Sequence, residues 1–174
     1  MRIILASKSG VRKKILDDFK LDNEVIISNV DEDEVKRSLL IEGADPLSIS
    51  KNLAEIKSIK VSTKNPGRIV LGADSVISFN NELINKPKSR EEALKILKKL
   101  NNSKHYLISS VCISKNGSMI WNYTDKAALT MKKMSDEELK EYLDKISDEA
   151  LYAYNVYQIE GEGRNLFSNI EGDE

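Results

Sequence analysis

Residues 68–79, with the sequence Arg-Ile-Val-Leu-Gly-Ala-Asp-Ser-Val-Ile-Ser-Phe, constrain the fold more than any other stretch of this chain. Their apolar and β-branched character predicts a strand that is buried in a sheet. Asp74 stands in the middle of the stretch, where a carboxylate is costly to bury unless it has a partner. Gly72 and Ala73 precede it, and their small size lets another group approach the backbone. The stretch predicts either an acid held rigidly beside open space, as a metal site or a general base requires, or a strand end where Asp74 points to water.

The composition narrows the chemistry that is available to this acid. Cys112 is the only cysteine and His105 is the only histidine among the 174 residues. A cysteine-based zinc site is therefore excluded, and neither a Ser-His-Asp triad nor a multi-histidine metal site is expected. Any metal would be held by carboxylates, which favours Mg²⁺ or Mn²⁺. We expect Cys112 to be a core residue of a strand and His105 to be a polar residue at a strand edge.

Charge and hydropathy bear on the location and the partners of the protein. The formal net charge is −1, which gives no indication of the basic surface that nucleic-acid-binding proteins need. The apolar start over residues 1–6 is too short for a signal peptide, and no later apolar run is long enough to cross a membrane. We therefore expect a cytoplasmic protein with one domain over residues 1–174, no nucleic-acid partner and no membrane association.

The beginning of the chain predicts a strand, a short polar loop and then a helix. Residues 2–6 are apolar, and apolar residues recur with helical spacing over residues 11–20. Ser9 or Gly10 can cap this helix. The N–H groups at such a helix start favour an anion, and the charge of Arg12 adds to the effect. The alternative is an ordinary turn between a strand and a helix, with solvated basic side chains.

The rest of the chain mixes strands, helices and hairpins, so we expect an α/β fold with a mixed sheet. Helix-start signals stand at residues 45–46, 89–92 and 135–138, and hairpin turns are predicted at residues 80–81 and 115–117. The four acids of residues 31–34 are interpreted mostly as a solvated loop. One of these acids, directed inward, would give a metal site its second carboxylate.

Six short motifs follow one another along the chain. They are Leu-Ala-Ser-Lys-Ser-Gly-Val-Arg (5–12), Val-Asp-Glu (30–32), Leu-Gly-Ala-Asp-Ser-Val (71–76), Lys-Pro (86–87), Glu-Gly-Glu-Gly (160–163) and Ile-Glu-Gly-Asp (170–173). Together they resemble the Maf family of nucleoside triphosphate pyrophosphatases. No single motif is specific, whereas six in this order and at fitting spacings are highly specific, and they extend over nearly the whole chain.

The resemblance implies a Maf/ITPase-like α/β fold, in which helices flank a mixed, elongated central sheet and two lobes surround a nucleotide cleft. It implies the hydrolysis of nucleoside triphosphates, non-canonical or modified ones in particular, to NMP and pyrophosphate with Mg²⁺ or Mn²⁺. Family members commonly form dimers, so a homodimer is implied as well. The alternative is a catalytically weak nucleotide-binding or regulatory protein of the same fold, linked to cell division.

The resemblance also assigns roles to the positions that match the family's motifs. Asp74 matches the proton acceptor, and Glu32 and Asp74 would hold the metal. The positions that match phosphate or substrate binding are Ser7, Ser9, Arg12, Lys57, Ser75, Lys86 and Glu160. For Lys57 and Lys86 taken alone, a solvated surface charge is the alternative.

This sequence departs from the family pattern in several places. Gly10-Val11 replaces the usual Pro-Arg, and Ser75 replaces the usual Thr but keeps a hydroxyl. Glu160 replaces a Gln, and because an ionised Glu offers only acceptors, it favours a base with donors, such as guanine, or a cationic methylated base. Family members normally continue with an aromatic residue, a Gly-Leu-Pro segment and a final helix. This chain stops at Glu174, so we expect the usual C-terminal segment to be lacking.

Overall fold

The computed structural model describes residues 1–172 and confirms the expected α/β class. The strands are β1 (Ile3–Leu5), β2 (Asn23–Val25), β3 (Val70–Phe79), β4 (Glu82–Ile84), β5 (Lys104–Lys115), β6 (Ser118–Met131) and β7 (Phe167–Glu171). The helices are α1 (Gly10–Asp18), α2 (Glu32–Ile41), α3 (Pro46–Lys64), α4 (Arg90–Leu100), α5 (Asp136–Asp144), α6 (Asp148–Tyr154) and the 3₁₀ helix η1 (Glu162–Leu166). No helix within the described residues is long and apolar enough to span a membrane.

The sheet is mixed, as expected. Its strand order is β2-β1-β3-β5-β6-β7, and β4 pairs with β3 beside this path. β1 runs parallel to both β2 and β3, whereas β4 and β7 run antiparallel to the strands that they pair with. The chain forms two compact units, of which the first holds Met1–Ser75 and Ile108–Asp125, and the second holds Val76–Leu107 and the chain from Lys126 onward. A single domain with a nucleotide cleft stays a prediction.

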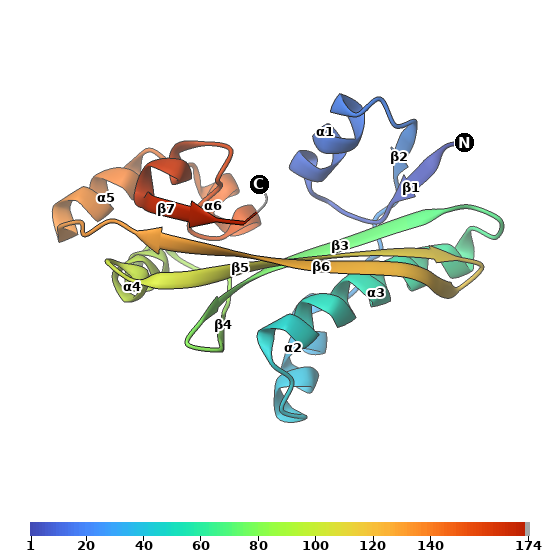
Figure 1. Ribbon diagram of the computed structural model, residues 1–174, viewed down its shortest axis with the longest axis horizontal. Helices are drawn as coiled ribbons and strands as arrows, with labels where there is room; N and C mark the ends of the chain where they lie inside the picture. Colours follow the sequence, from blue (N-terminus) through green and yellow to red (C-terminus); the bar gives the residue numbers. More distant parts are fainter. Residues whose placement is uncertain (173–174) are drawn as a thin grey trace. The chain divides into compact units, whose positions relative to one another are not determined.

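In the first unit, the parallel strands leave part of the β3 backbone open. Figure 1 shows α1 over one face of β1 and β3, and α3 over the other face. Ile4 of β1 lies opposite Val70 of β3, and both side chains are fully buried. The last backbone bond between these two segments joins the Ala6 N–H to the Leu71 carbonyl. Because β1 ends there, the following carbonyls of β3 can accept hydrogen bonds from side chains.

Helix α3 approaches β3 very closely at Gly72. A Cβ atom at this glycine would lie 2.3 Å from the backbone oxygen of Ala54 and 2.9 Å from the Cβ of Ser58. The face of α3 that meets the sheet is made of small buried residues, among them Ser50, Ala54 and Ser58. The prediction that small residues before Asp74 admit another group is therefore confirmed, and that group is α3.

Pairs of hydroxyl groups join α3 to β5 and β6, and we call this set of contacts the hydroxyl seam. Ser50 Oγ lies 2.9 Å from Ser110 Oγ, which lies 2.8 Å from Thr124 Oγ1. Two turns further along the helix, Ser58 Oγ lies 2.7 Å from Ser114 Oγ. Hydrogen bonds are directional, so the seam sets the position of α3 along the strands.

The acidic run over residues 31–34 begins a helix, so the prediction of a solvated loop is wrong. Asp31 is the N-cap of α2, and its Oδ1 accepts a hydrogen bond of 3.1 Å from the Glu34 N–H. The acids that follow occupy the first turn of the helix. Negative charge is favourable there because it interacts with the positive end of the helix dipole. The run therefore has a structural role and also fixes the position of Glu32 at the start of α2.

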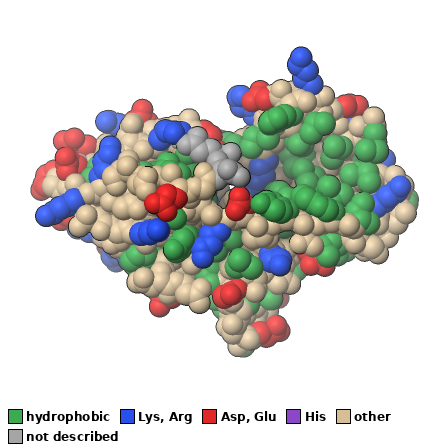
Figure 2. Space-filling view, viewed as in Figure 1, with side chains coloured by type: hydrophobic (Ala, Val, Ile, Leu, Met, Phe, Trp, Pro, Cys, Tyr) green, Lys and Arg blue, Asp and Glu red, His purple; other side chains and the backbone are tan. Residues whose placement is uncertain are grey.

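The part of β6 that belongs to the first unit carries exposed apolar side chains. Ile120, Trp121 and Tyr123 are 58%, 49% and 54% exposed, and the two aromatic rings stack with centroids 6.2 Å apart. Figure 2 shows hydrophobic side chains gathered over α1 and the strands of the first unit. Contiguous apolar surface of this kind is uncommon on monomeric proteins and often marks a contact surface.

The second unit has the larger apolar core. It is formed by side chains such as Leu97 of α4, Leu129 of β6 and Leu139 of α5, all fully buried. The helix starts predicted around residues 89 and 135 are confirmed. Ser89 and Ser135 each cap a helix by accepting a hydrogen bond from the N–H three residues later.

His105 is fully buried in the second unit, so its assignment to a strand edge is wrong, whereas Cys112 is buried in β5 as predicted. The His105 ring packs against Phe167, and its Nε2 lies 2.8 Å from the Tyr157 hydroxyl. Within residues 1–172, Nδ1 has no hydrogen-bond partner. Burial disfavours the charged imidazolium and lowers the pKa of His105 to about 4.

This burial predicts that acid destabilises the protein through His105. The pKa rises from about 4 in the folded chain to the ordinary 6.5 in the unfolded chain. Between these values only the unfolded chain binds the proton, so the free energy of unfolding decreases as the pH falls, by roughly 3 kcal/mol in total. His105→Gln cannot take up this proton. Urea unfolding measures the free energy of unfolding at pH 7 and at pH 4. Its decrease between these two pH values should be about 3 kcal/mol smaller for His105→Gln than for the wild type. Equal losses in the two proteins would contradict the assignment.

Candidate active site

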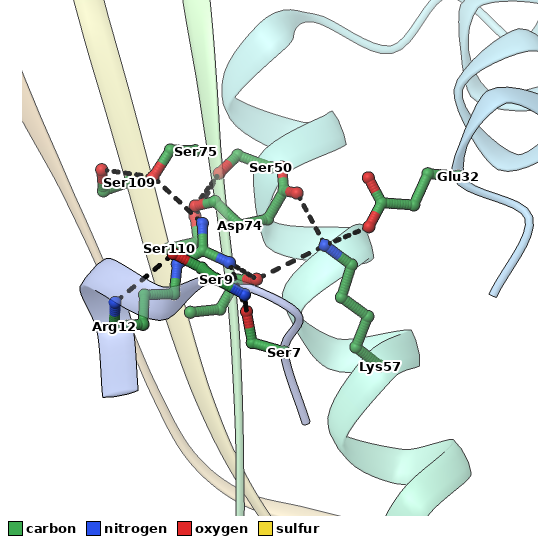
Figure 3. Close-up of polar contacts among 11 residues, drawn as sticks. Ser7, Ser9, Arg12, Glu32, Ser50, Lys57, Asp74, Ser75, Ser109 and Ser110 are labelled. Atoms are coloured by element: carbon green, nitrogen blue, oxygen red, sulfur yellow. Dashed lines mark hydrogen bonds and ion pairs between the residues drawn. The ribbon is translucent and has the colours of Figure 1, made fainter. Parts of the chain in front are cut away.

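The N-terminal end of α1 brings four of the predicted substrate-binding residues together. Ser9 caps the helix, because its Oγ accepts a hydrogen bond of 3.3 Å from the Arg12 N–H. The Arg12 guanidinium reaches β3, where Nη1 lies 2.9 Å from the Ala73 carbonyl oxygen, and it also contacts Ser7 Oγ at 3.1 Å. Its Nη2 lies 3.4 Å from Ser75 Oγ (Figure 3). Ser7, Ser9, Arg12 and Ser75 thus form one polar cluster around the open part of β3.

A row of three charged side chains lies beside this cluster. Lys57 Nζ of α3 lies 3.0 Å from Asp74 Oδ1 and 2.7 Å from Glu32 Oε1 of α2. Figure 3 shows the ammonium group between the two carboxylates. The side chains of Asp74 and Lys57 are each 7% exposed, whereas that of Glu32 is 36% exposed. Asp74 is therefore a buried acid with a charged partner, and the interpretation of a strand end where it points to water is wrong.

One oxygen of the Asp74 carboxylate has no hydrogen bond. Oδ2 is buried and has no partner within residues 1–172, although Oδ1 is paired with Lys57. Burial raises the pKa of the Asp74 carboxyl above its ordinary value, and the Lys57 ammonium acts in the opposite direction. The Ser50 hydroxyl donates to the main-chain carbonyl of Asp74 at 3.2 Å. The result is a rigidly held carboxylate with a raised proton affinity and one oxygen available for a proton.

Two cationic side chains from different helices meet at a single carbonyl. The Ala73 oxygen accepts from Arg12 Nη1 at 2.9 Å and from Lys57 Nζ at 3.4 Å. Charge-assisted hydrogen bonds from such groups are the strong interactions that bind phosphate oxygens. The open part of β3 therefore places two cations, of a kind suited to phosphate oxygens, next to one buried acid.

The same residues fit a divalent cation that is shared with a substrate. Glu32 and Asp74 supply two carboxylates, and Glu32 Oε1 and Asp74 Oδ1 both face the position of the Lys57 ammonium. In the described part of the chain, no group of three or more His, Cys, Asp or Glu side chains converges as a complete metal site. Mg²⁺ is commonly bound by one or two carboxylates and completes its coordination with substrate phosphates and water. A two-carboxylate site suits that mode of binding.

Two of the predicted substrate-binding residues belong to the second unit. Lys86 is exposed two residues after the end of β4, and the following Pro87 is buried. Glu160 is exposed in the turn before η1. The contacts that join Ser7, Ser9, Arg12, Glu32, Lys57, Asp74 and Ser75 lie within the first unit, so the roles of Lys86 and Glu160 stay predictions.

Sequence reasoning missed the hydroxyl groups that support the cluster. Ser109 Oγ of β5 lies 2.9 Å from Ser75 Oγ, and Ser50 with Ser110 supports the Asp74 backbone. Each pair is far apart in the sequence, and serine is common on strands and helices alike. Only the pairing of β3 with β5 and the close approach of α3 to β3 bring these hydroxyl groups together.

Comparison with known proteins identifies the family. A family model described as Maf-like protein matches residues 2–174. A nucleoside triphosphate pyrophosphatase of Pelagibacter ubique (strain HTCC1062) is 67% identical over 172 residues, which cover 99% of this chain and 88% of that protein. A 7-methyl-GTP pyrophosphatase of Brucella abortus biovar 1 (strain 9-941) is 34% identical over 173 residues, 99% of this chain and 87% of that protein. This chain therefore belongs to the Maf-like protein family.

Proposed function

We propose that this protein hydrolyses nucleoside triphosphates to NMP and pyrophosphate. The observation that carries the proposal is the convergence of Asp74, Lys57 and Arg12 at the open part of β3, where a buried acid with an unpartnered oxygen lies beside two cations. The reaction needs a proton acceptor for the attacking water and positive charge for the phosphates. The name of the Pelagibacter relative, nucleoside triphosphate pyrophosphatase, supports the same reaction.

Asp74 is the proposed general base. In this role the carboxylate accepts a proton from the water that attacks the α-phosphate. The raised pKa increases its proton affinity, and Oδ2 has no existing hydrogen bond to break. The position of the group on a central strand supports the proposal, because a base must be held within hydrogen-bond reach of the proton that it removes.

Arg12, Lys57 and Ser7 are the proposed phosphate-binding groups of the first unit. The guanidinium and the ammonium can bind phosphate oxygens by charge-assisted hydrogen bonds. Ser9 holds the start of α1, and Ser75 holds the Arg12 side chain by a contact of 3.4 Å. Lys86 and Glu160, which belong to the second unit, stay predicted substrate-binding residues.

Glu32 and Asp74 would hold the divalent cation, Mg²⁺ or Mn²⁺. When bound, such a cation neutralises charge on the phosphates and so favours the transition state of the hydrolysis. The support for this part of the proposal is the donor set itself, because two carboxylates that face one position suit a hard cation.

The proposed substrate carries a modified and positively charged base. The Brucella relative is named 7-methyl-GTP pyrophosphatase, and its alignment covers 99% of this chain. Methylation at N7 of guanine gives the base a positive charge. Glu160, exposed before η1, offers a carboxylate that attracts such a charge and accepts hydrogen bonds from guanine.

The proposed function is tested by following pyrophosphate release from UTP, dTTP, GTP and 7-methyl-GTP with Mg²⁺ or Mn²⁺. We expect release of pyrophosphate, with the highest kcat/KM for 7-methyl-GTP. Glu160→Gln should lower the ratio of kcat/KM for 7-methyl-GTP over GTP by about tenfold, which corresponds to ~1.4 kcal/mol. Glu149→Gln is the matched control, because Glu149 is also exposed in the second unit, and it should leave the ratio unchanged.

Three outcomes would contradict parts of this proposal. Release of inorganic phosphate in place of pyrophosphate would exclude the reaction at the α-phosphate. Nucleotide binding without turnover would favour the catalytically weak regulatory protein. A substrate profile that Glu160→Gln leaves unchanged would remove Glu160 from base recognition.

The proposal also includes the assembly and the location of the protein. The exposed Ile120, Trp121 and Tyr123 of β6 support self-association, because exposed apolar surface often marks a subunit interface. We propose a homodimer that acts in the cytoplasm, with a nucleoside triphosphate as its substrate and without a nucleic-acid partner.

A further inference from the structure

The Lys57 ammonium occupies the place where a shared metal ion would bind. Its Nζ lies 2.7 Å from Glu32 Oε1 and 3.0 Å from Asp74 Oδ1, so it bridges the two proposed metal ligands (Figure 3). A Mg²⁺ ion bound to both oxygens would need distances of about 2.0–2.1 Å to each of them. The ion and the ammonium would then lie next to each other, and two adjacent cations repel strongly in a buried site.

The surroundings of Lys57 allow its head group to leave. Within residues 1–172, its ammonium donates to one backbone group, the Ala73 carbonyl at 3.4 Å, and this carbonyl also accepts a shorter bond of 2.9 Å from Arg12. The next carbonyl, that of Asp74, accepts from Ser50. Departure of the ammonium therefore leaves both backbone oxygens paired. It removes the ammonium that pairs with the two carboxylates, and a dication can take the same place between Glu32 Oε1 and Asp74 Oδ1.

The destination of the ammonium is close to its present position. Arg12 and Lys57 share the Ala73 oxygen, so a phosphate group held by Arg12 would lie within reach of the long and flexible Lys57 side chain. One movement would then exchange two carboxylate contacts of the ammonium for contacts with phosphate oxygens. The negative phosphates of the substrate then replace the two carboxylates as the partners of the ammonium.

We propose that Lys57 is the resident counter-ion of Glu32 and Asp74, that a divalent metal replaces it, and that the displaced ammonium binds the polyphosphate. This inference rests on the proposed function. It follows that the protein without nucleotide binds free divalent metal weakly, because the metal must displace Lys57 with no phosphate to receive it. The metal should enter together with the nucleotide, as a metal–nucleotide complex.

The binding of Mn²⁺ to the protein without nucleotide, measured by electron paramagnetic resonance, tests this inference directly. Removal of the competing ammonium in Lys57→Met should tighten Mn²⁺ binding by about tenfold or more relative to the wild type. Lys51→Met is the matched control, because Lys51 is an exposed lysine on the same helix, and it should bind Mn²⁺ like the wild type. Adding Glu32→Gln to Lys57→Met should abolish the gain. Equal Mn²⁺ affinity in the wild type and Lys57→Met would overturn the inference.

A second measurement covers the case in which Lys57→Met does not fold without metal. Lys57→Gln keeps a hydrogen-bonding group but no charge, and Mn²⁺ should raise its thermal midpoint more than that of the wild type. Failure of this inference and failure of the proposed function give different results. Asp74-dependent turnover by the wild type with equal Mn²⁺ affinity in both proteins overturns the inference alone. Tightened Mn²⁺ binding in Lys57→Met without turnover by the wild type supports the displacement and contradicts the proposed function.

Discussion

Asp74→Asn is expected to lower kcat/KM for pyrophosphate release by about 10²–10⁴-fold, the range typical of a lost general base. The amide has nearly the size of the carboxylate, so it should fit between Lys57 and the β3 backbone. It cannot accept a proton from water, and it is a weaker ligand for a divalent cation. The loss should therefore be much larger than the loss for any residue that only positions the substrate.

The assay compares kcat/KM of the wild type, Asp74→Asn and the control Asp33→Asn with one nucleoside triphosphate at saturating Mg²⁺. Asp33 is exposed in the first turn of α2, next to Glu32, so its substitution makes the same change of charge outside the cluster. Circular dichroism melts establish that each variant is folded. A folded Asp74→Asn protein that keeps kcat/KM within a factor of about ten of the wild type would exclude Asp74 as the base.

Gly72→Ala is expected to have the largest effect on stability. The added methyl group would lie 2.3 Å from the Ala54 carbonyl oxygen and 2.9 Å from the Ser58 backbone nitrogen, so the backbone of α3 must move. Overpacking of this kind costs about 1–3 kcal/mol or more. The same movement would draw Lys57 away from Asp74 and break the hydroxyl seam, so the cost should be at the upper end.

Urea unfolding at pH 7 measures this loss as a decrease in the midpoint concentration. Gly161→Ala is the matched control, because a Cβ there would meet its nearest neighbour at 4.0 Å, an ordinary contact. Its free energy of unfolding should change by no more than about 0.5 kcal/mol. A Gly72→Ala protein as stable as the control would show that α3 does not require a glycine beneath it.

Much of the local structure could be predicted because its signals lie within a few residues of one another. Asn80-Asn81 predicts a hairpin turn, and both residues have the positive φ angles that such a turn requires. Ser135 with Glu138 predicts a capping box, and both of its hydrogen bonds are present. For the acids of residues 31–34, the local pattern led to a wrong prediction. Their pattern is that of a solvated loop, yet an N-terminal helix turn accommodates the same charges.

The tertiary contacts could not be predicted from local patterns. His105 is buried because Tyr157 and Phe167, more than fifty residues away, enclose it, and no signal near residue 105 indicates this. The resemblance to a family supplied Lys57 and Glu32 as site residues. It gave no indication that the ammonium bridges the two carboxylates, which depends on how α2 and α3 sit against β3.

Cooling should weaken the packing of α3 against the strands less than it weakens the apolar core of the second unit. Hydrophobic stabilisation weakens as the temperature falls, since it depends on the entropy of water. The hydroxyl seam joins Ser50 to Ser110 and Ser58 to Ser114 by hydrogen bonds that have no such dependence on apolar burial. In cold water the helix that carries Lys57 is therefore expected to stay in place, and loosening is expected to begin among the leucines of the second unit.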